Sequence, residues 1–134
     1  WDETYPNSEI ILDDLKARTY FVAEENGEIV GGINIDEKQD PTYLTIDWED
    51  KTKQFLVVHR LAVKEEFWQN GVGKKLMLFV EEVILEEGYQ SIRLDTYSGN
   101  PKAMEFYKKL GYTQLGHIHL KEGKNEYYCF EKVI

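Results

Sequence analysis

The chain is short of cysteine and of positive charge. Its single cysteine, Cys129, cannot form an internal disulfide, so we expect a reducing, cytoplasmic compartment. Its 16 lysines and arginines are outnumbered by 25 aspartates and glutamates, and the net charge of −9 argues against nucleic acid and anionic membranes as partners. We find no membrane-spanning apolar run, no signal peptide, no internal repeat and no spacing typical of a metal site.

At 134 residues, one domain covering residues 1–134 is expected. A helix is predicted from Asn7 or Ser8 to Leu15. Two more helices are predicted, one after Gly71, with an apolar stripe from Val72 to Ile84, and one after Asn100. Hydrophobic alternation predicts strands over Thr19–Ala23, Glu28–Ile35, Phe55–Val63, Ser91–Thr96, Tyr112–Leu120 and Glu126–Val133. This order predicts an α/β (α+β) fold, with helices flanking a mixed, mostly antiparallel central sheet.

Turn and cap residues mark several element ends. Asn26-Gly27 is a strong hairpin signal, because both residues tolerate a positive φ. Gly31-Gly32 predicts a bulge or a close backbone approach in the second strand. Gly88 is a natural left-handed cap, and Asn100-Pro101 is typical of a helix start.

The stretch Gln69-Asn70-Gly71-Val72-Gly73-Lys74 joins a predicted strand to a predicted helix. Its glycines allow a tight turn, and the first turn of the helix offers unpaired N–H groups that bind anions, above all phosphate. The spacing excludes the nucleotide P-loop and the dinucleotide fingerprint, which lacks its third glycine because position 76 is leucine.

Three segments together resemble the GCN5-related N-acetyltransferase (GNAT) family. His59 to Val63 looks like the end of the family's central strand. Gln69 to Lys74 is similar to its pyrophosphate loop, Gln-x-x-Gly-x-Gly. Asn100 to Tyr112 resembles its last-helix signature, Asn-x-x-Ala-x-x-Phe-Tyr-x-x-x-Gly-Tyr/Phe. The resemblance runs from about Tyr5 to the end of the chain.

The resemblance implies direct transfer of the acetyl group of acetyl-CoA, the co-substrate, to an amine, without a metal. Tyr107 would act as the general acid for the departing thiolate, although an apolar helix face also suits a core tyrosine. A main-chain N–H near Leu61 would stabilise the oxyanion. The implied cofactor-binding residues are Leu61, Ala62, Val63, Gln69, Asn70, Gly71, Val72, Gly73, Lys74 and Asn100.

The front of the chain departs from the family pattern. Members usually have a strand and a first helix before the element placed at Asn7 to Leu15, and both are absent upstream of Trp1. Because these pieces commonly help to build the acceptor site, two interpretations stay open. The chain is an active N-acetyltransferase, or it is a catalytically idle acyl-CoA-binding or regulatory module. An interaction protein on the same fold has no support beyond the versatility of folds.

The acceptor, the general base and the oligomeric state are left open, and a homodimer is compatible with the sequence. The acceptor is a primary amine of a small molecule or protein. The acidic, aromatic stretch 36–52 is either a rim that favours cationic acceptors or, as we prefer, a solvated loop pinned by Tyr43 and Trp48. The candidate bases are His59, Asp47, Glu49 and Asp95, besides a water chain. Two further histidines, His117 and His119, are interpreted as structural.

Overall fold

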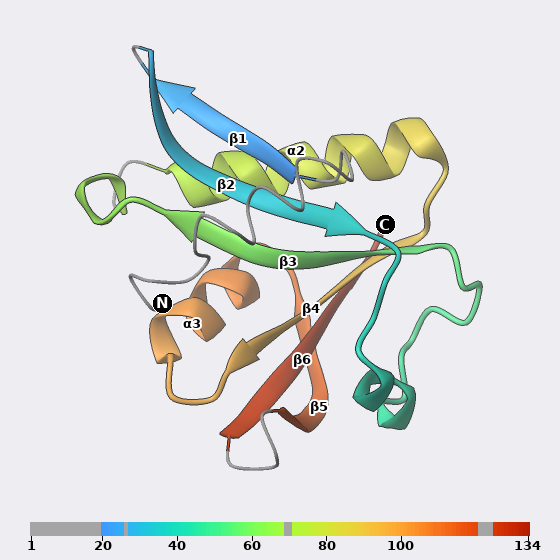
Figure 1. Cartoon of the computed structure of the whole chain (residues 1–134). Coiled ribbons are helices and arrows are strands. Elements are labelled where there is room, and N and C mark those ends of the chain that lie inside the picture. The colour runs from blue at the N-terminus through green and yellow to red at the C-terminus, as the bar shows by residue number, and fades with distance from the viewer. Residues whose placement is uncertain (1–19, 26, 69–70, 121–124) are drawn as a thin grey trace. The chain divides into compact units, whose positions relative to one another are not determined.

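The computed structural model describes residues 20–25, 27–68, 71–120 and 125–134 (Figure 1). The predicted helix from Asn7 to Leu15 and the loop residues Gln69 and Asn70 lie outside the described residues. The chain divides into two compact units: the first spans residues 1–36 and 58–83, and the second spans 37–57 and 84–134. Each unit is described by itself.

Six strands and two α-helices follow the predicted order. Along the chain they are β1 (Tyr20–Glu25), β2 (Glu28–Asp36), η1 (Pro41–Thr45), β3 (Phe55–Val63), η2 (Glu65–Phe67), α2 (Val72–Glu87), β4 (Ser91–Tyr97), α3 (Pro101–Lys109), β5 (Thr113–Leu120) and β6 (Asn125–Val133). The hydrogen-bonding order of the strands is β1-β2-β3-β4-β6-β5. The β3–β4 pair is parallel, whereas β1–β2, β4–β6 and β5–β6 are antiparallel. The predicted mixed, mostly antiparallel fold is confirmed.

The first unit contains the predicted hairpin and the predicted close approach. Gly27, with φ of 82°, lies in the turn between β1 and β2. The register shifts beyond Ala23, whose partner is Gly31, so β2 carries a bulge beside the glycine pair. A Cβ on Gly31 would lie 2.9 Å from the carbonyl oxygen of Ala62. Only glycine therefore lets β2 lie this close to the end of β3.

The apolar stripe of α2 is buried as predicted. Val72, Leu76 and Val80 are among the buried residues of the core. Phe79 packs against Phe21 of β1, with ring centroids 5.0 Å apart. None of the helices in the described part of the chain is long and apolar enough to cross a bilayer.

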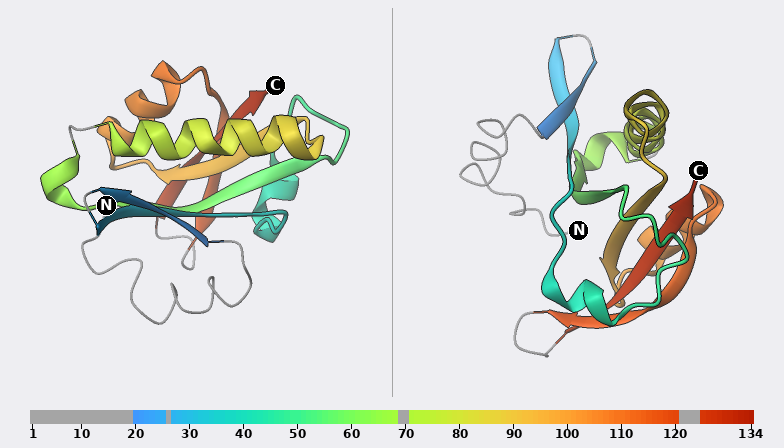
Figure 2. Two further views of the ribbon diagram at one scale, coloured as in Figure 1. Left: turned by 90° about the horizontal axis from the view of Figure 1, so that it is seen from above. Right: turned by 90° about the vertical axis from the view of Figure 1, so that its right-hand side faces the viewer.

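In the second unit, β6 lies between β4 and β5 (Figure 2). Stretch 36–52 contains a short helix that the sequence analysis missed. Asp40 caps η1 by accepting the N–H of Thr42 at 2.9 Å, and Pro41 opens the helix. η1 lies against β5. The core here consists of Tyr43, Trp48, Val57, Ile118 and Cys129. Because both predicted aromatics are buried, the interpretation of a loop pinned by Tyr43 and Trp48 is confirmed.

The predicted helix ends are also confirmed. Gly88 and Gly111 adopt φ values of 81° and 95° after α2 and α3. The side-chain oxygen of Asn100 accepts the N–H of Ala103 at 3.2 Å, and Pro101 is the first residue of α3. These are local signals, each satisfied within one helical turn.

Candidate functional site

The backbone of β3 is irregular one residue before Leu61, Ala62 and Val63, the predicted cofactor-binding positions. Arg60 has φ of 53°, in the left-handed region that residues with a Cβ rarely adopt. Such a conformation costs about 1–3 kcal/mol and tends to persist at binding and catalytic sites. β3 therefore leaves regular strand geometry where the resemblance places the ligand-binding main chain.

Part of the main chain beyond this irregularity is already hydrogen-bonded. The Val63 carbonyl accepts the indole N–H of Trp68 at 2.7 Å. The N–H of Lys64 donates to the carbonyl of Val30 at 2.8 Å. A ligand contact by Val63 therefore has to use its N–H or the second lone pair of its carbonyl oxygen.

The predicted glycine turn leads directly into α2. Gly71 has φ of 76°, and a Cβ built on it would meet no atom of the described chain within 4 Å. The first hydrogen bond shown for this helix end runs from the Lys75 N–H to the Gly71 carbonyl, 3.0 Å. The N–H groups of Val72, Gly73 and Lys74 precede it and have no partner one turn earlier in the helix. This end of α2 has open space beside Gly71 and donors that suit a phosphate.

The match to the family's loop pattern needs one correction. Aligned on Gly71 and Gly73, Gln-x-x-Gly-x-Gly begins at position 68, which is tryptophan in this chain. Gln69 is one residue out of register, so the two glycines, which the turn physically requires, provide the match. Trp68 instead donates its indole N–H back to the end of β3.

Asn100 and Tyr107, from the second unit, lie on α3. Asn100 caps the helix, and Tyr107 is buried. The ring of Tyr107 packs against Tyr112 and Phe130, with centroids 5.9 and 6.0 Å away. Both structural roles weighed in the sequence analysis are therefore present, and the functional roles of the two residues stay predictions.

The pKa of Tyr107 is raised, first by burial and then by the negative charge of Asp95. The hydroxyl therefore keeps its proton at physiological pH, which is the form that a general acid needs. A raised pKa also makes it a weaker acid than free tyrosine, so the contribution of this hydroxyl to the rate has to be measured.

Asp95 is held by a residue that the sequence analysis did not link to it. The hydroxyl of Tyr43 donates a hydrogen bond to the Asp95 carboxylate. Burial, followed by the charge of Asp95, raises the pKa of Tyr43 well above its ordinary value. Burial and Asp95 also raise the pKa of Cys129 to about 12, which leaves the thiol protonated and non-nucleophilic.

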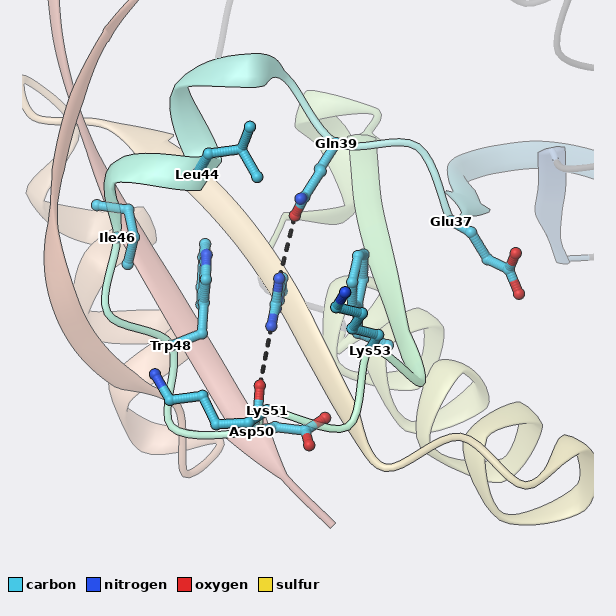
Figure 3. A pocket seen from close by; sticks show the side chains of 10 residues that line it. Glu37, Gln39, Leu44, Ile46, Trp48, Asp50, Lys51 and Lys53 are labelled. Atoms are coloured by element: carbon cyan, nitrogen blue, oxygen red, sulfur yellow. Dashed lines mark hydrogen bonds between the residues drawn. The ribbon is translucent and has the colours of Figure 1, made fainter.

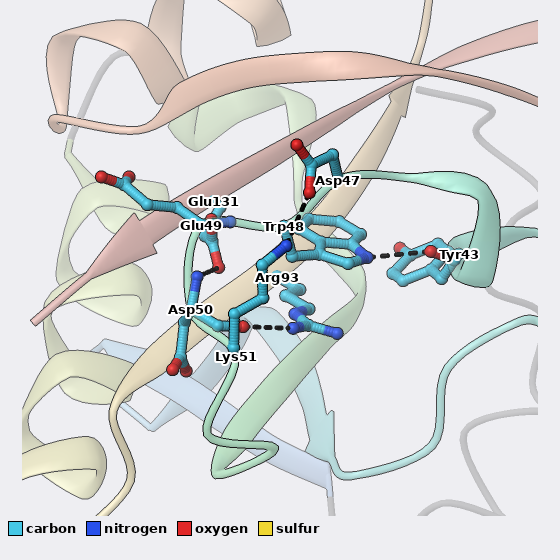
Figure 4. Close-up of polar contacts among 8 residues, drawn as sticks. All are labelled: Tyr43, Asp47, Trp48, Glu49, Asp50, Lys51, Arg93 and Glu131. Atoms are coloured by element: carbon cyan, nitrogen blue, oxygen red, sulfur yellow. Dashed lines mark hydrogen bonds and ion pairs between the residues drawn. The ribbon is translucent and has the colours of Figure 1, made fainter.

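The other candidate bases have different surroundings. The Asp47 side chain is 96% exposed and pairs with Lys51 at 2.6 Å, which lowers its pKa through that hydrogen bond and charge (Figure 4). Glu49 is exposed. His59 contacts the carboxylate of Asp36, with 2.9 Å between Nε2 and Oδ1.

A buried polar group anchors the acidic stretch in the second unit. Glu131 accepts the main-chain N–H groups of Glu49 and Asp50 at 2.8 and 3.2 Å (Figure 4). Asp50 accepts the hydroxyl of Ser91 at 2.6 Å. Asp50 is therefore an internal structural group and does not belong to a solvated acidic rim.

Arg93 lies beside a hollow of about 450 Å³ in the second unit (Figure 3). Its guanidinium carbon is 4.5 and 4.0 Å from the ring centroids of Trp48 and Phe55. It donates to the Gln39 side chain and the Asp50 carbonyl at 3.1 and 3.0 Å. Sequence reasoning missed this stacked arginine because three segments of the chain supply its partners.

Comparisons with known proteins agree with the motifs. A model of the Acetyltransferase (GNAT) family matches residues 1–112. The chain is similar to S-(2-succino)cysteine N-acetyltransferase of Bacillus subtilis (strain 168), with 26% identity over 119 residues, 86% of this chain and 67% of that protein. It is also similar to N-acetyltransferase 8B of Homo sapiens, with 29% identity over 97 residues, 72% of this chain and 39% of that protein. The chain thus spans between 39% and 67% of the length of these two relatives.

Solved structures share the fold. An acetyltransferase of the GNAT family from Streptococcus agalactiae 2603 matches with a TM-score of 0.81 and 22% identity, covering 100% of this chain and 76% of that one. Ard1 from Thermoplasma volcanium matches with a TM-score of 0.77 and 22% identity, covering 97% of this chain and 81% of that one.

Proposed function

Because the chain belongs to the GNAT acetyltransferase family, we propose that it transfers the acetyl group of acetyl-CoA directly to a primary amine of a small molecule or protein. The main support is the glycine turn that opens α2. Gly71 has a positive φ with open space beside it, and the unpaired N–H groups of the first helical turn follow. This end of the helix fits a pyrophosphate.

The proposed acetyl-CoA contacts come from both units. In the first unit they are the main chain of Leu61, Ala62 and Val63 and the helix start, Gly71, Val72, Gly73 and Lys74, with Gln69 and Asn70 completing the loop. In the second unit, the Asn100 side-chain oxygen already accepts the Ala103 N–H. Its contact with the CoA arm would therefore use the amide NH₂ group.

The chemistry is a direct transfer with Tyr107 as the acid. The raised pKa and complete burial of Cys129 disfavour an acyl-cysteine route. Relatives are named for amine acceptors, such as thialysine N-epsilon-acetyltransferase of Bos taurus, and one matched structure is an aminoglycoside 6'-N-acetyltransferase complexed with coenzyme A. The net charge of −9 favours a cationic acceptor. Asp47 contributes less to this preference than the sequence suggested, because Lys51 pairs with it.

Binding of acetyl-CoA by three glycine variants tests the phosphate-binding turn. Gly71→Asp and Gly73→Asp place a carboxylate at the helix start and should reduce acetyl-CoA affinity by at least about tenfold, since each 1.4 kcal/mol of lost or repulsive interaction is a factor of ten. Gly27→Asp is the matched control. Gly27 also has a positive φ, 82°, and open space around it, but it lies in the β1–β2 turn. Equal affinities in all variants would remove the turn from the binding site.

Catalysis is tested separately by thiol release from acetyl-CoA with a panel of primary amines. Amine-dependent release supports the transferase. Tight acetyl-CoA binding without release for any amine would contradict it and favour the idle acyl-CoA-binding module.

A further inference from the structure

His59 is held by a carboxylate within the first unit. It lies on β3, and its Nε2 is 2.9 Å from Oδ1 of Asp36, the last residue of β2. The side chains of His59 and Asp36 are 26% and 17% exposed, so the pair is sheltered but still reached by water. An ionised carboxylate only accepts hydrogen bonds. Nε2–H therefore donates to Asp36 in neutral His59, and Nδ1 is the basic nitrogen.

A third residue extends this pair into the core. Nδ2 of Asn34 donates to the second carboxylate oxygen of Asp36 at 3.3 Å. Asn34 is only 1% exposed, and its Oδ1 has no partner among the described residues. A buried acceptor without a partner costs about 1–3 kcal/mol, so such a group calls for a reason other than stability. Asn34 orients Asp36, which in turn orients His59.

The position of His59 along β3 connects the pair to the proposed reaction. His59 lies two residues before Leu61, about 7 Å along a strand at roughly 3.3 Å per residue. Arg60, between them, has the left-handed φ of 53°. The imidazole is therefore carried by the short segment of strand whose main chain is proposed to hold the thioester.

The remaining candidate bases are engaged or poorly supported. Asp95 accepts the hydroxyl of Tyr43, and Asp47 pairs with Lys51. No carboxylate or other charged side chain is shown to orient the exposed Glu49. Among the four candidates, His59 alone combines a basic nitrogen with an orienting carboxylate, the arrangement expected of a general base.

We propose that His59, oriented by Asp36 and Asn34, is the general base that deprotonates the acceptor amine; this inference rests on the proposed acetyltransferase function. Nδ1 takes one proton from the alkylammonium and later returns it to water. The neutral amine nitrogen forms the new C–N bond as the C–S bond breaks, and the electron pair of that bond leaves with sulfur. The second amine proton is lost as the amide forms, and the thiolate is protonated by Tyr107 or water.

Turnover with matched glutamine variants tests the base. Gln at position 59 can still donate to Asp36 but cannot take a proton. His59→Gln should therefore lower kcat by about 10²–10⁴-fold, the usual contribution of general acid–base catalysis, with acetyl-CoA affinity and thermal unfolding unchanged. His117→Gln is the control, because His117 also lies on a strand beside a carboxylate, with Nδ1 3.7 Å from Glu126. Its kcat should equal that of the wild type. Full kcat in His59→Gln would overturn the proposal.

Two readouts separate catalysis from structure. Added imidazole should restore part of the activity of His59→Ala, which a purely structural histidine would not allow. In the free protein, long-range ¹H–¹⁵N NMR should show neutral His59 as the Nε2–H tautomer, and Asp36→Asn should change that tautomer population. An Nδ1–H tautomer in the wild type would overturn the proposal without any turnover. Failure of the proposed function would look different, since the wild type itself would then release no thiol with any amine.

Discussion

The buried hydrogen bond between Tyr43 and Asp95 sets up a clean test of what holds the second unit together. Tyr43→Phe removes one hydroxyl and keeps the ring, which is 1% exposed and packs against Trp48 with centroids 5.3 Å apart. The Trp48 indole still donates to the main-chain carbonyl of residue 43, 2.9 Å in the wild type. The perturbation is therefore confined to the bond with the carboxylate.

The size of the effect follows from the charge of the acceptor. A hydrogen bond to a charged group contributes about 1.5–3 kcal/mol net, and Asp95 would lose this partner in a half-buried position. We expect the free energy of unfolding to fall by that amount and the Tm to fall by roughly 5–10 °C. Because the pKa of Tyr43 is raised on folding, this stabilisation is full below the unfolded-state pKa of about 10 and is lost as pH rises further. The gap between the two proteins should therefore narrow above about pH 10.

Tyr89→Phe is the matched control, measured by urea unfolding at pH 7. Tyr89 also donates its hydroxyl to a carboxylate, that of Glu37, but this pair is exposed. An exposed pair contributes about 0–1 kcal/mol, so the control should lose much less stability. Equal losses in the two variants would refute the argument that burial decides the cost. An unchanged free energy of unfolding in Tyr43→Phe would show that the bond with Asp95 adds nothing.

Three further predictions concern the acid, a buried carboxylate and a close approach. Tyr107→Phe should lower kcat and kcat/KM together by about 10²–10⁴-fold with unchanged acetyl-CoA affinity, and full kcat would return Tyr107 to a purely structural role. Burial alone would raise the pKa of Asp50, but hydrogen bonds from Ser91 and Thr52 hold it below its ordinary value. The stability advantage of wild type over Asp50→Asn should therefore be constant at neutral pH and shrink below about pH 4 in acid unfolding; a pH-independent difference would contradict this. Gly31→Ala places a Cβ 2.9 Å from a backbone oxygen and should cost about 1–3 kcal/mol in urea unfolding, and an unchanged midpoint would show that the strands can separate.

Signals confined to a few neighbouring residues were sufficient for much of the fold. The bounds of β3 agree with the prediction because Phe55–Val63 is apolar on both faces. The cap at Asn100, the C-cap at Gly88 and the β1–β2 turn each depend on φ preferences or bonds within one turn of chain. η1 was missed although Asp40 and Pro41 are ordinary start signals, because its acidic surroundings resembled a solvated loop.

The candidate site was only partly readable. The glycines at positions 71 and 73 carry the phosphate-binding signal, since the turn itself requires them. The left-handed backbone of Arg60 has no signal in the sequence, because an arginine adopts it only when the surrounding structure imposes it. The hydroxyl bond of Tyr43 joins residues 52 positions apart, and the bond of Glu131 to Glu49 joins residues 82 apart.

By itself, therefore, the sequence determined the order of elements, their caps and the motif of an acetyl-CoA-binding family, because periodicity, turn chemistry and helix starts are local properties. It left His59 as one of four equal candidates for the base. Only the tertiary structure decided between them, by placing His59 within hydrogen-bond distance of Asp36, 23 positions earlier, and by giving Asp95 and Asp47 other partners. Which side chains meet across a sheet depends on strand pairing and register, and these are set by the packing of the whole chain.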